Sequence, residues 1–259
     1  MKKKLLILQN AFHFRSFSFF KYIFFKKRRR KIKSKATKYF YELPCIDFDE
    51  WASTQNKDLY LEMKKFQDEF VLFEKKFDFS HLGGSRGLDQ FSALYFFTIL
   101  LKPEFILETG VANGYSTFSF LSGIHQNKKG FLVSNDLPPL DIKKENWDYI
   151  GQMVPEQFKP KWKLFLGADK NNLKNITKNY DFDLAHFDSD KTKSGKMFCI
   201  ETVIKNNFKH PLILIDNCAD DFFWQGLKVE NYSKFIFEQN KKRFGALIYK
   251  EHLSRLLLD

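Results

Sequence analysis

The stretch EFILETGVANGYSTFSF, residues 104–120, decides the fold of this chain. Its apolar run ends at Glu108, and Gly110 and Gly114 then precede a helical pattern. This order predicts a buried strand, a tight turn and a helix, as at the ligand-binding turn of a doubly wound α/β sheet. The glycine spacing is GxxxG, which differs from the GxGxxG that seats a pyrophosphate. A carboxylate beside the turn would repel a diphosphate, so this turn suits a cationic ligand group such as an ammonium or a sulfonium.

The rest of the chain alternates short apolar runs with helical patterns, which predicts a mostly parallel sheet covered on both faces. The expected fold class is therefore α/β, Rossmann-like and doubly wound. Two helical patterns precede the sheet, at 47–77 and 88–101. The predicted strands are 105–108, 130–136, 161–167, 182–188, 211–217 and 245–250. The predicted helices between them are 115–126, 170–179 and 194–207.

The net charge of +12 is concentrated at the N-terminus. Residues 1–41 contain fourteen Lys or Arg and no Asp or Glu, whereas the rest of the chain carries 29 basic and 31 acidic residues. We therefore divide the chain into a basic, aromatic-rich arm at 1–41, a helical extension at 42–103 and a ligand-binding core at 104–259. Three widely spaced cysteines without a CxxC pair argue against a disulfide framework or a zinc knuckle and indicate a reducing compartment.

The arm has three interpretations. Its phenylalanine clusters beside KKRRRKIKSK (26–35) are typical of a segment at an anionic membrane surface. Arg15 and Lys21 interrupt its apolar part, which argues against a transmembrane span. The alternatives are a nucleic-acid tail and a leader that is disordered or packed on the domain. Since the core is nearly neutral, we expect a cytoplasmic protein with peripheral membrane contact through the arm rather than a nucleic-acid partner.

Acidic residues end the next two predicted strands. Asp136 lies where an acid accepts hydrogen bonds from both ribose hydroxyls of a nucleoside. Asp169 follows the third strand, where an acid or a neighbouring backbone amide is placed to read the adenine edge. The alternative for Asp169 is a cap for the helix that follows. The pattern predicts a nucleoside-containing ligand.

Five blocks in order carry a family resemblance: ETGVANGYST (108–117), NDLPP (135–139), VPEQFKPKWKLFLGAD (154–169), FDLAHFDSD (182–190) and LILIDN (212–217). The chain resembles the class I S-adenosylmethionine-dependent methyltransferases, and within them a bacterial branch associated with O-methylation of small molecules, sugars or cell-surface polysaccharides. The likeness runs from about residue 83 to 250 and implies a seven-stranded sheet. The implied cofactor-binding residues are Glu108, Gly110, Ala112, Asn113, Gly114, Ser116, Thr117, Asp136, Asp169 and Asp188, with Glu108 and the glycines around the methionine part and Asp136 on the ribose.

Asp188, Asp216 and Asn217 end the fourth and fifth strands and point into the same crevice. Two carboxylates and an amide oxygen form an all-oxygen set suited to Mg²⁺ or a similar cation. The set is similar to the metal triad of catechol-type O-methyltransferases, a resemblance that makes Lys191 the catalytic base. The bacterial branch usually has DSxHxY here, whereas this chain has DSDKTK. The alternatives are that these residues only line the pocket, or that the acceptor site has decayed.

Two further features near these strands can be explained by packing without a catalytic role. His186 lies one residue off the strand end, which favours a packed or supporting histidine over a catalyst. Phe222, Phe223 and Trp224 either wall the acceptor pocket or pack in the core.

The sequence predicts an S-adenosylmethionine-dependent O-methyltransferase whose acceptor is a hydroxyl of a small molecule, sugar or glycan. A nucleic-acid methyltransferase, suggested by the arm, and a catalytically inactive nucleoside-binding protein, suggested by the missing histidine, remain open. The acceptor, the metal and the oligomeric state do not follow from the sequence.

Overall fold

The chain folds around one eight-stranded sheet, seen in a computed structural model that describes residues 6–7, 9–10, 26–77, 90–138 and 147–258. The strand order is β1-β7-β8-β6-β5-β2-β3-β4. The strands are β1 (Ile46–Asp47), β2 (Phe105–Thr109), β3 (Phe131–Asp136), β4 (Trp162–Leu166), β5 (Leu184–Phe187), β6 (Leu212–Ile215), β7 (Tyr232–Gln239) and β8 (Lys242–Tyr249). Strand β8 runs antiparallel to both β6 and β7, and the other described pairs are parallel.

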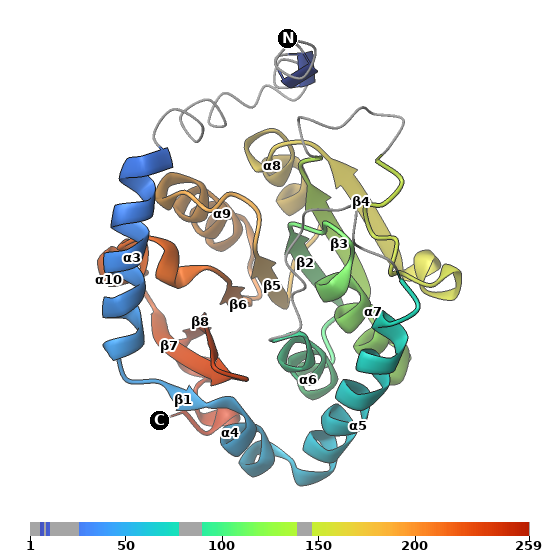
Figure 1. The fold of residues 1–259 in the computed structure, drawn as a ribbon. Coiled ribbons are helices and arrows are strands. Elements are labelled where there is room, and N and C mark those ends of the chain that lie inside the picture. Colours follow the sequence, from blue (N-terminus) through green and yellow to red (C-terminus); the bar gives the residue numbers. More distant parts are fainter. Residues whose placement is uncertain (1–5, 8, 11–25, 78–89, 139–146, 259) are drawn as a thin grey trace.

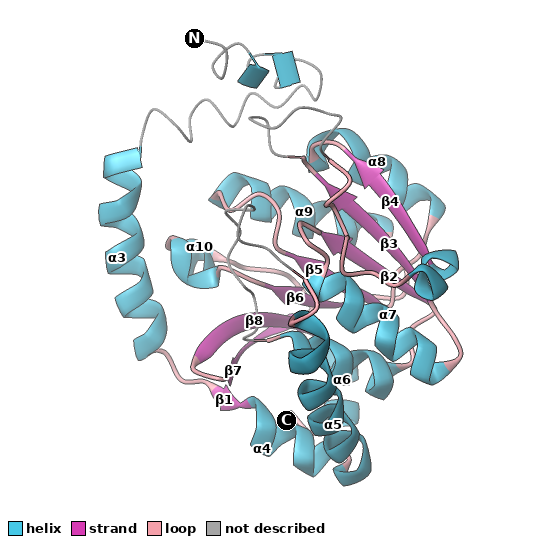
Figure 2. Cartoon of the chain, turned by 45° about the vertical axis from the view of Figure 1, so that its right-hand side comes forward, coloured by secondary structure: helices cyan, strands magenta, loops and turns pink. Residues whose placement is uncertain are grey.

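Helices pack on both faces of this sheet (Figure 1, Figure 2). One face is covered by α4 (Phe48–Gln55), α5 (Lys57–Glu74), α6 (Phe91–Leu101) and α7 (Tyr115–Asn127). The other carries α3 (Lys26–Glu42), α8 (Asp169–Asn179), α9 (Lys193–Asn206) and the short α10 (Phe223–Gly226). The described 3-10 turns are η2 (Glu156–Lys161), η3 (Cys218–Asp220), η4 (Lys250–His252) and η5 (Ser254–Leu256).

The central strands are buried on both faces, which explains their continuous apolar runs. Ile106 and Leu184 join the core under α6 and α7, whereas Leu107 and Ala185 join the core under α8 and α9. Successive side chains of a strand point to opposite faces, so both sides of β2 and β5 must be apolar. The same alternation places Glu108 on the α7 face, where it is the polar exception in β2.

The expected α/β, doubly wound fold is confirmed, with three differences. The sheet has eight strands and not the implied seven, because β1 adds an edge strand beside β7. Strand β7 was not predicted, because its hairpin with β8 turns through Asn240 and Lys241, at φ 51° and 64°, without the Asn-Gly that normally marks such a turn. The helical pattern 47–77 is two helices, since Asn56 is extended and its side chain accepts the Leu59 N–H to cap α5. Residues 78–89, which include the expected breaker and the start of the second pattern, lie outside the described residues.

The expected boundary of the arm at residue 41 falls inside helix α3. Ala36 and Phe40, one helical turn apart, are fully buried against the sheet, and the Phe40 ring meets Trp224 edge-on with centroids 6.3 Å apart. Arg243 on β8 donates to the carbonyl oxygens of Tyr41 and Leu43, each at 2.9 Å. The C-terminal half of α3 is therefore part of the domain, as the packed-leader alternative proposed.

Helix α3 packs along the segment that follows β6 (Figure 1). Thr37 Oγ1 donates to the Ala219 carbonyl oxygen at 3.1 Å, and Lys33 Nζ lies 2.6 Å from Asp220 Oδ1. The aromatic clusters of the arm before residue 26 lie outside the described residues. Contact of the arm with an anionic membrane stays a prediction. None of the helices that the structure describes is long and apolar enough to cross a membrane.

Candidate active site

The turn after β2 lies at the carboxyl ends of the parallel strands. Gly110 and Gly114 have φ of 87° and 94°, which glycine adopts without steric cost. A Cβ on Gly110 would lie 2.8 Å from the Asp188 carbonyl oxygen, and one on Gly114 would lie 2.9 Å from Gly151 Cα. The sequence suggested that bare backbone is needed beside a ligand. In the structure the close neighbours are two other segments of the chain.

The residues between the two glycines are held by backbone bonds. Gly151 N–H donates to the Ala112 carbonyl at 2.8 Å, and Met153 N–H donates to the Asn113 carbonyl at 3.1 Å. Ala112 itself has a positive φ of 46°. The turn is therefore rigidly placed above the ends of β2 and β3, where a ligand would meet it.

Glu108 is fully buried beneath this turn and accepts hydrogen bonds from three hydroxyls. Ser116 Oγ donates to Oε1 at 2.5 Å, while Thr117 Oγ1 and Ser134 Oγ donate to Oε2 at 2.8 and 2.6 Å. Burial raises the pKa of Glu108 to about 7, although the three hydroxyls act in the opposite direction. Ser116 and Thr117, in the first turn of α7, thus hold this carboxyl group, and no side chain caps the helix.

Stability should depend on the ionisation of Glu108. Between its usual pKa of 4.5 and about 7, the folded state keeps a proton that the unfolded state releases, so stability falls as pH rises. At about 1.4 kcal/mol per pH unit, the loss relative to Glu108→Gln is about 3 kcal/mol and is complete above pH 7. Urea unfolding of both proteins between about pH 4 and pH 8 measures this difference, because other groups titrate alike in both. Parallel pH profiles would contradict the assignment.

Asp136 ends β3 beside the same turn. Its carboxylate accepts from the backbone N–H groups of Val111, Ala112 and Leu137, and burial raises its pKa to about 6 despite these bonds. The predicted position of Asp136 is thus confirmed: its carboxylate faces the glycine turn at the strand end. Its role towards a ribose stays a prediction.

Asp169 lies at the centre of a polar cluster at the ends of β2, β3 and β5. Asn135 Nδ2 donates to its Oδ1 at 2.8 Å, and Ser189 Oγ donates to its Oδ2 at 2.5 Å. Burial raises the pKa of Asp169. The alternative that Asp169 caps the next helix is wrong, because the N-cap position of α8 is Ala168 and no side chain caps it. The carboxylate is instead turned towards the strand ends.

The predicted acceptor-side residues also lie together. Asn217 Nδ2 donates to Asp188 Oδ1, and Lys191 Nζ is 3.5 Å from the same oxygen. Asp216 accepts the Asn217 N–H at 2.7 Å through Oδ1 and faces Lys242 Nζ at 3.4 Å through Oδ2. Each of the two carboxylates thus faces one ammonium group, and the sequence did not suggest the second of these, Lys242.

Charge and burial set the ionisation of this group. Burial and the neighbouring Asp216 raise the pKa of Asp188 to about 7, against the effect of Lys191 and Lys242. Burial alone would lower the pKa of Lys191, but the carboxylates of Asp188, Asp216 and Asp220 raise it. Lys191 is therefore held as a cation. The role of proton acceptor that the resemblance implied for Lys191 stays a prediction, and it would require Lys191 to lose its proton first.

The structure agrees with the packing interpretation for His186, Phe223 and Trp224. His186 is buried on the α7 face, its ring is 5.8 Å from that of Phe120, and burial lowers its pKa to about 4. Phe223 and Trp224 are buried in the core beside α3, whereas Phe222 is exposed. Among the described hydrogen bonds, none joins the side chain of His186 or Trp224 to the aspartates at the strand ends.

Sequence reasoning missed four polar residues of the site: Ser134, Asn135, Ser189 and Lys242. Ser134 and Asn135 interrupt the apolar run of β3, which was a usable signal for buried polar partners. Ser189 follows Asp188 and bonds to Asp169. Lys242 had no local signal, since it reaches Asp216 only because the unpredicted hairpin places β8 beside β6.

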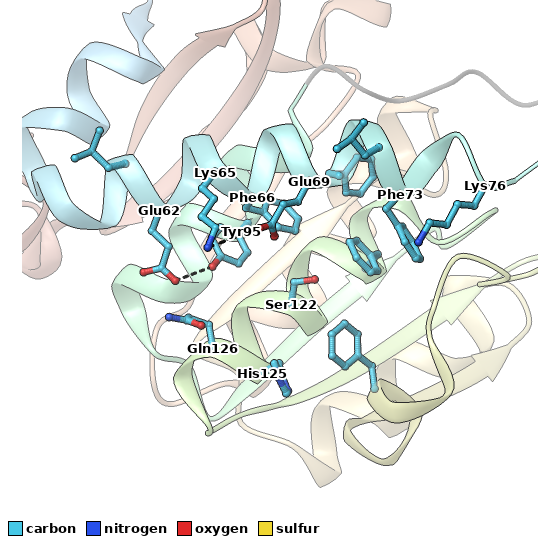
Figure 3. Close-up of a pocket in the computed structure, with 15 residues that line it drawn as sticks. Glu62, Lys65, Phe66, Glu69, Phe73, Lys76, Tyr95, Ser122, His125 and Gln126 are labelled. Carbon is cyan, nitrogen blue, oxygen red and sulfur yellow. Dashed lines mark hydrogen bonds and ion pairs between the residues drawn. The ribbon is translucent and has the colours of Figure 1, made fainter.

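A separate open cavity of about 810 Å³ lies between α5, α6, α7 and η2 (Figure 3). Its wall is aromatic, including Phe66, Phe73 and Phe118, and Tyr95 at its edge donates a hydrogen bond to Glu62 at 3.1 Å. None of the strand-end residues lines it. The cavity is therefore distinct from the candidate site.

The strand order and the acidic strand ends define a Rossmann-like protein with its site at the carboxyl edge of the sheet. Residues 107–218, from β2 to the start of η3, match a family model described as a methyltransferase domain. No curated protein matches the chain. The fold and this match agree with the class I S-adenosylmethionine-dependent methyltransferases that the sequence resembles.

Solved structures share the fold at low sequence identity. An SAH-bound methyltransferase from Podospora anserina is 21% identical, with a TM-score of 0.52 over 71% of this chain and 86% of that one. An O-methyltransferase from Bacillus cereus in complex with SAH is 16% identical, with a TM-score of 0.50 over 77% of this chain and 96% of that one. TomG, an O-methyltransferase from Streptomyces achromogenes in complex with SAM, is 14% identical, with a TM-score of 0.50 over 85% and 98%.

Proposed function

We propose that the protein transfers a methyl group from S-adenosylmethionine to a hydroxyl of a small molecule, sugar or cell-surface glycan. The observation that carries this proposal is the arrangement of two acidic groups on either side of the Gly110 turn. Asp136 lies at the end of β3 on one side of the turn, and Asp188 with its lysine lies after β5 on the other. Asp169 bonds to Asn135 on the first side and to Ser189 on the second. One side suits a nucleoside, and the other suits a second substrate.

On the cofactor side, the chain offers a carboxylate for each polar part of the nucleoside. Asp136 at the end of β3 would accept from the ribose hydroxyls, replacing the backbone N–H groups that it now binds. Asp169, which follows β4, and its partner Asn135 at the end of β3 would face the base. The buried Glu108 supports the turn from below and contributes negative charge near the sulfonium when ionised.

On the acceptor side, Asp188 and Lys191 are the groups placed to contact the acceptor hydroxyl. Both are partly exposed, at 34% and 45% of the side chain, so a substrate reaches them from solvent. When bound, S-adenosylmethionine supplies an electrophilic methyl group on sulfur. The chain's own contribution would be to hold the acceptor hydroxyl beside Asp188, whose carboxylate would accept the hydroxyl proton. Orientation by Asp188 and Lys191 is the main contribution that we propose for the enzyme.

Calorimetry of the full chain with S-adenosylmethionine, its demethylated product and NAD tests the cofactor. We expect the first two to bind and Asp136→Ala to weaken them by about a hundredfold, since a charged hydrogen-bond acceptor is lost. The control is Asp148→Ala, because Asp148 is exposed and outside the site. Tighter binding of NAD would overturn the proposal.

A methyl-transfer screen tests the reaction. The screen uses radiolabelled S-adenosylmethionine and presents sugars, catechols and glycans beside RNA and DNA. Transfer to a hydroxyl substrate supports the proposal. Label on nucleic acid would favour the nucleic-acid methyltransferase, and cofactor binding without any transfer would favour the inactive nucleoside-binding protein.

A further inference from the structure

The oxygen atoms expected to hold a divalent cation already have partners within the chain. Asp216 Oδ1 accepts the Asn217 N–H at 2.7 Å, and Asp216 Oδ2 lies 3.4 Å from Lys242 Nζ. Asp188 Oδ1 accepts from Asn217 Nδ2 and lies 3.5 Å from Lys191 Nζ. Asn217 therefore presents its amide nitrogen, not its oxygen, to the neighbouring carboxylate. Three of the four carboxylate oxygens of the expected ligand set thus have a partner within the chain.

The charges around this group also differ from those of a metal site. Mg²⁺ requires near-octahedral oxygen ligands at about 2.1 Å and is attracted by uncompensated carboxylates. Here two carboxylates face two ammonium groups, so the local charge is already balanced. A divalent ion at this position would meet two like charges. Among the described residues, no group of three His, Cys, Asp or Glu is arranged to hold a metal ion.

Lys242 is anchored so that its ammonium group stays at this position. It begins β8, which pairs with β6 through Ile215 and Gly245, and it reaches the buried Asp216 from that hairpin. Asp216 is only 8% exposed in its side chain, so the loss of Lys242 would leave a buried carboxylate without its cation. Lys242 is thus a positioning residue for Asp216 and Asn217.

We propose that Lys191 and Lys242 take the place of a divalent cation in this site, and that the site binds no metal ion. Lys242 fixes the Asp216–Asn217 corner, and Lys191 presents positive charge where the acceptor oxygen would lie. The statement about the acceptor rests on the proposed function. The statement about ion binding does not, because it concerns only residues of this chain.

Mn²⁺ titration of the full chain, followed by the electron paramagnetic resonance signal of the free ion, tests the proposal without any substrate. We expect no stoichiometric binding to the wild type or to the control Lys250→Met, which removes an exposed lysine at the other end of β8. The double variant Lys191→Met, Lys242→Met should bind one equivalent, and Asp188→Asn in that background should abolish the binding.

Two results would overturn the proposal: one equivalent of Mn²⁺ bound by the wild type and lost in Asp188→Asn, or no binding by a folded double variant. If the double variant fails to unfold cooperatively, the Mn²⁺ titration is carried out on the single variant Lys191→Met. Its side chain is half exposed, so its replacement should not prevent folding. Failure of methyl transfer with every acceptor would leave the Mn²⁺ result unchanged. The two proposals are therefore separable.

Discussion

Gly110→Val should lower the free energy of unfolding by about 4 kcal/mol or more and abolish S-adenosylmethionine binding. A β-branched residue at φ 87° is strained by about 1–3 kcal/mol. Its Cβ would also lie 2.8 Å from the carbonyl oxygen and 2.9 Å from the carbonyl carbon of Asp188, both of which are backbone atoms. The strand-end loop that carries Asp188 must therefore move. Urea unfolding and calorimetry measure the two effects.

The matched control is Gly226→Val. Gly226 is exposed on α10, and the nearest atom to an added Cβ is the Lys193 ammonium at 3.4 Å, the free end of a flexible side chain. We expect a change of less than about 1 kcal/mol there. A Gly110 variant with wild-type stability would show that the Asp188 segment can shift at little cost.

Asp188→Asn should reduce turnover by about a hundredfold to a thousandfold while the affinity for S-adenosylmethionine changes less than about threefold. The amide keeps the size of the side chain but removes the charge opposite Lys191 and the charged acceptor for Asn217. Loss of rate without loss of cofactor binding is the signature of a group that acts on the acceptor. Single-turnover rates and calorimetry provide the two numbers.

Asp181→Asn is the control for this change. Asp181 accepts from the backbone N–H groups of Phe208 and Lys209 at the opposite end of β5, and an amide oxygen can replace it there. We expect wild-type turnover from this variant. Full activity of Asp188→Asn would remove Asp188 from the mechanism and leave only its structural bond to Asn217.

The sheet was predictable because its central strands are buried on both sides. Continuous apolar runs such as FILE and LILI leave few alternatives when helical patterns separate them. The position of the site followed as well, since the carboxyl ends of parallel strands meet at one edge. Glu108, Asp136 and Asp188 were found in this way, without knowledge of any contact.

The partners of these residues were not predictable, because they depend on register and on distant segments. Ser134 faces Glu108 only through the pairing of β3 with β2, and Lys242 meets Asp216 only through the β7–β8 hairpin. The glycine at position 110 indicates a close approach, but only the fold shows that the neighbour is the Asp188 carbonyl group. Lys191 illustrates the same limit, since its protonation depends on three carboxylates.

Helix α3 packs against η3 through Thr37 and Lys33, and η3 directly follows the Asp216–Asn217 corner, so we expect the docking of α3 and the order of this corner to be linked. Any molecule that binds the basic stretch Lys26–Lys35 more tightly when α3 is docked must stabilise the docked state by the same factor. The reverse holds too, because a substrate that orders the corner raises the affinity of the helix for that molecule. Reciprocity of this kind requires no contact between the two ligands. On this expectation, a molecule bound to the N-terminal charge of the chain would change the affinity of the proposed acceptor site.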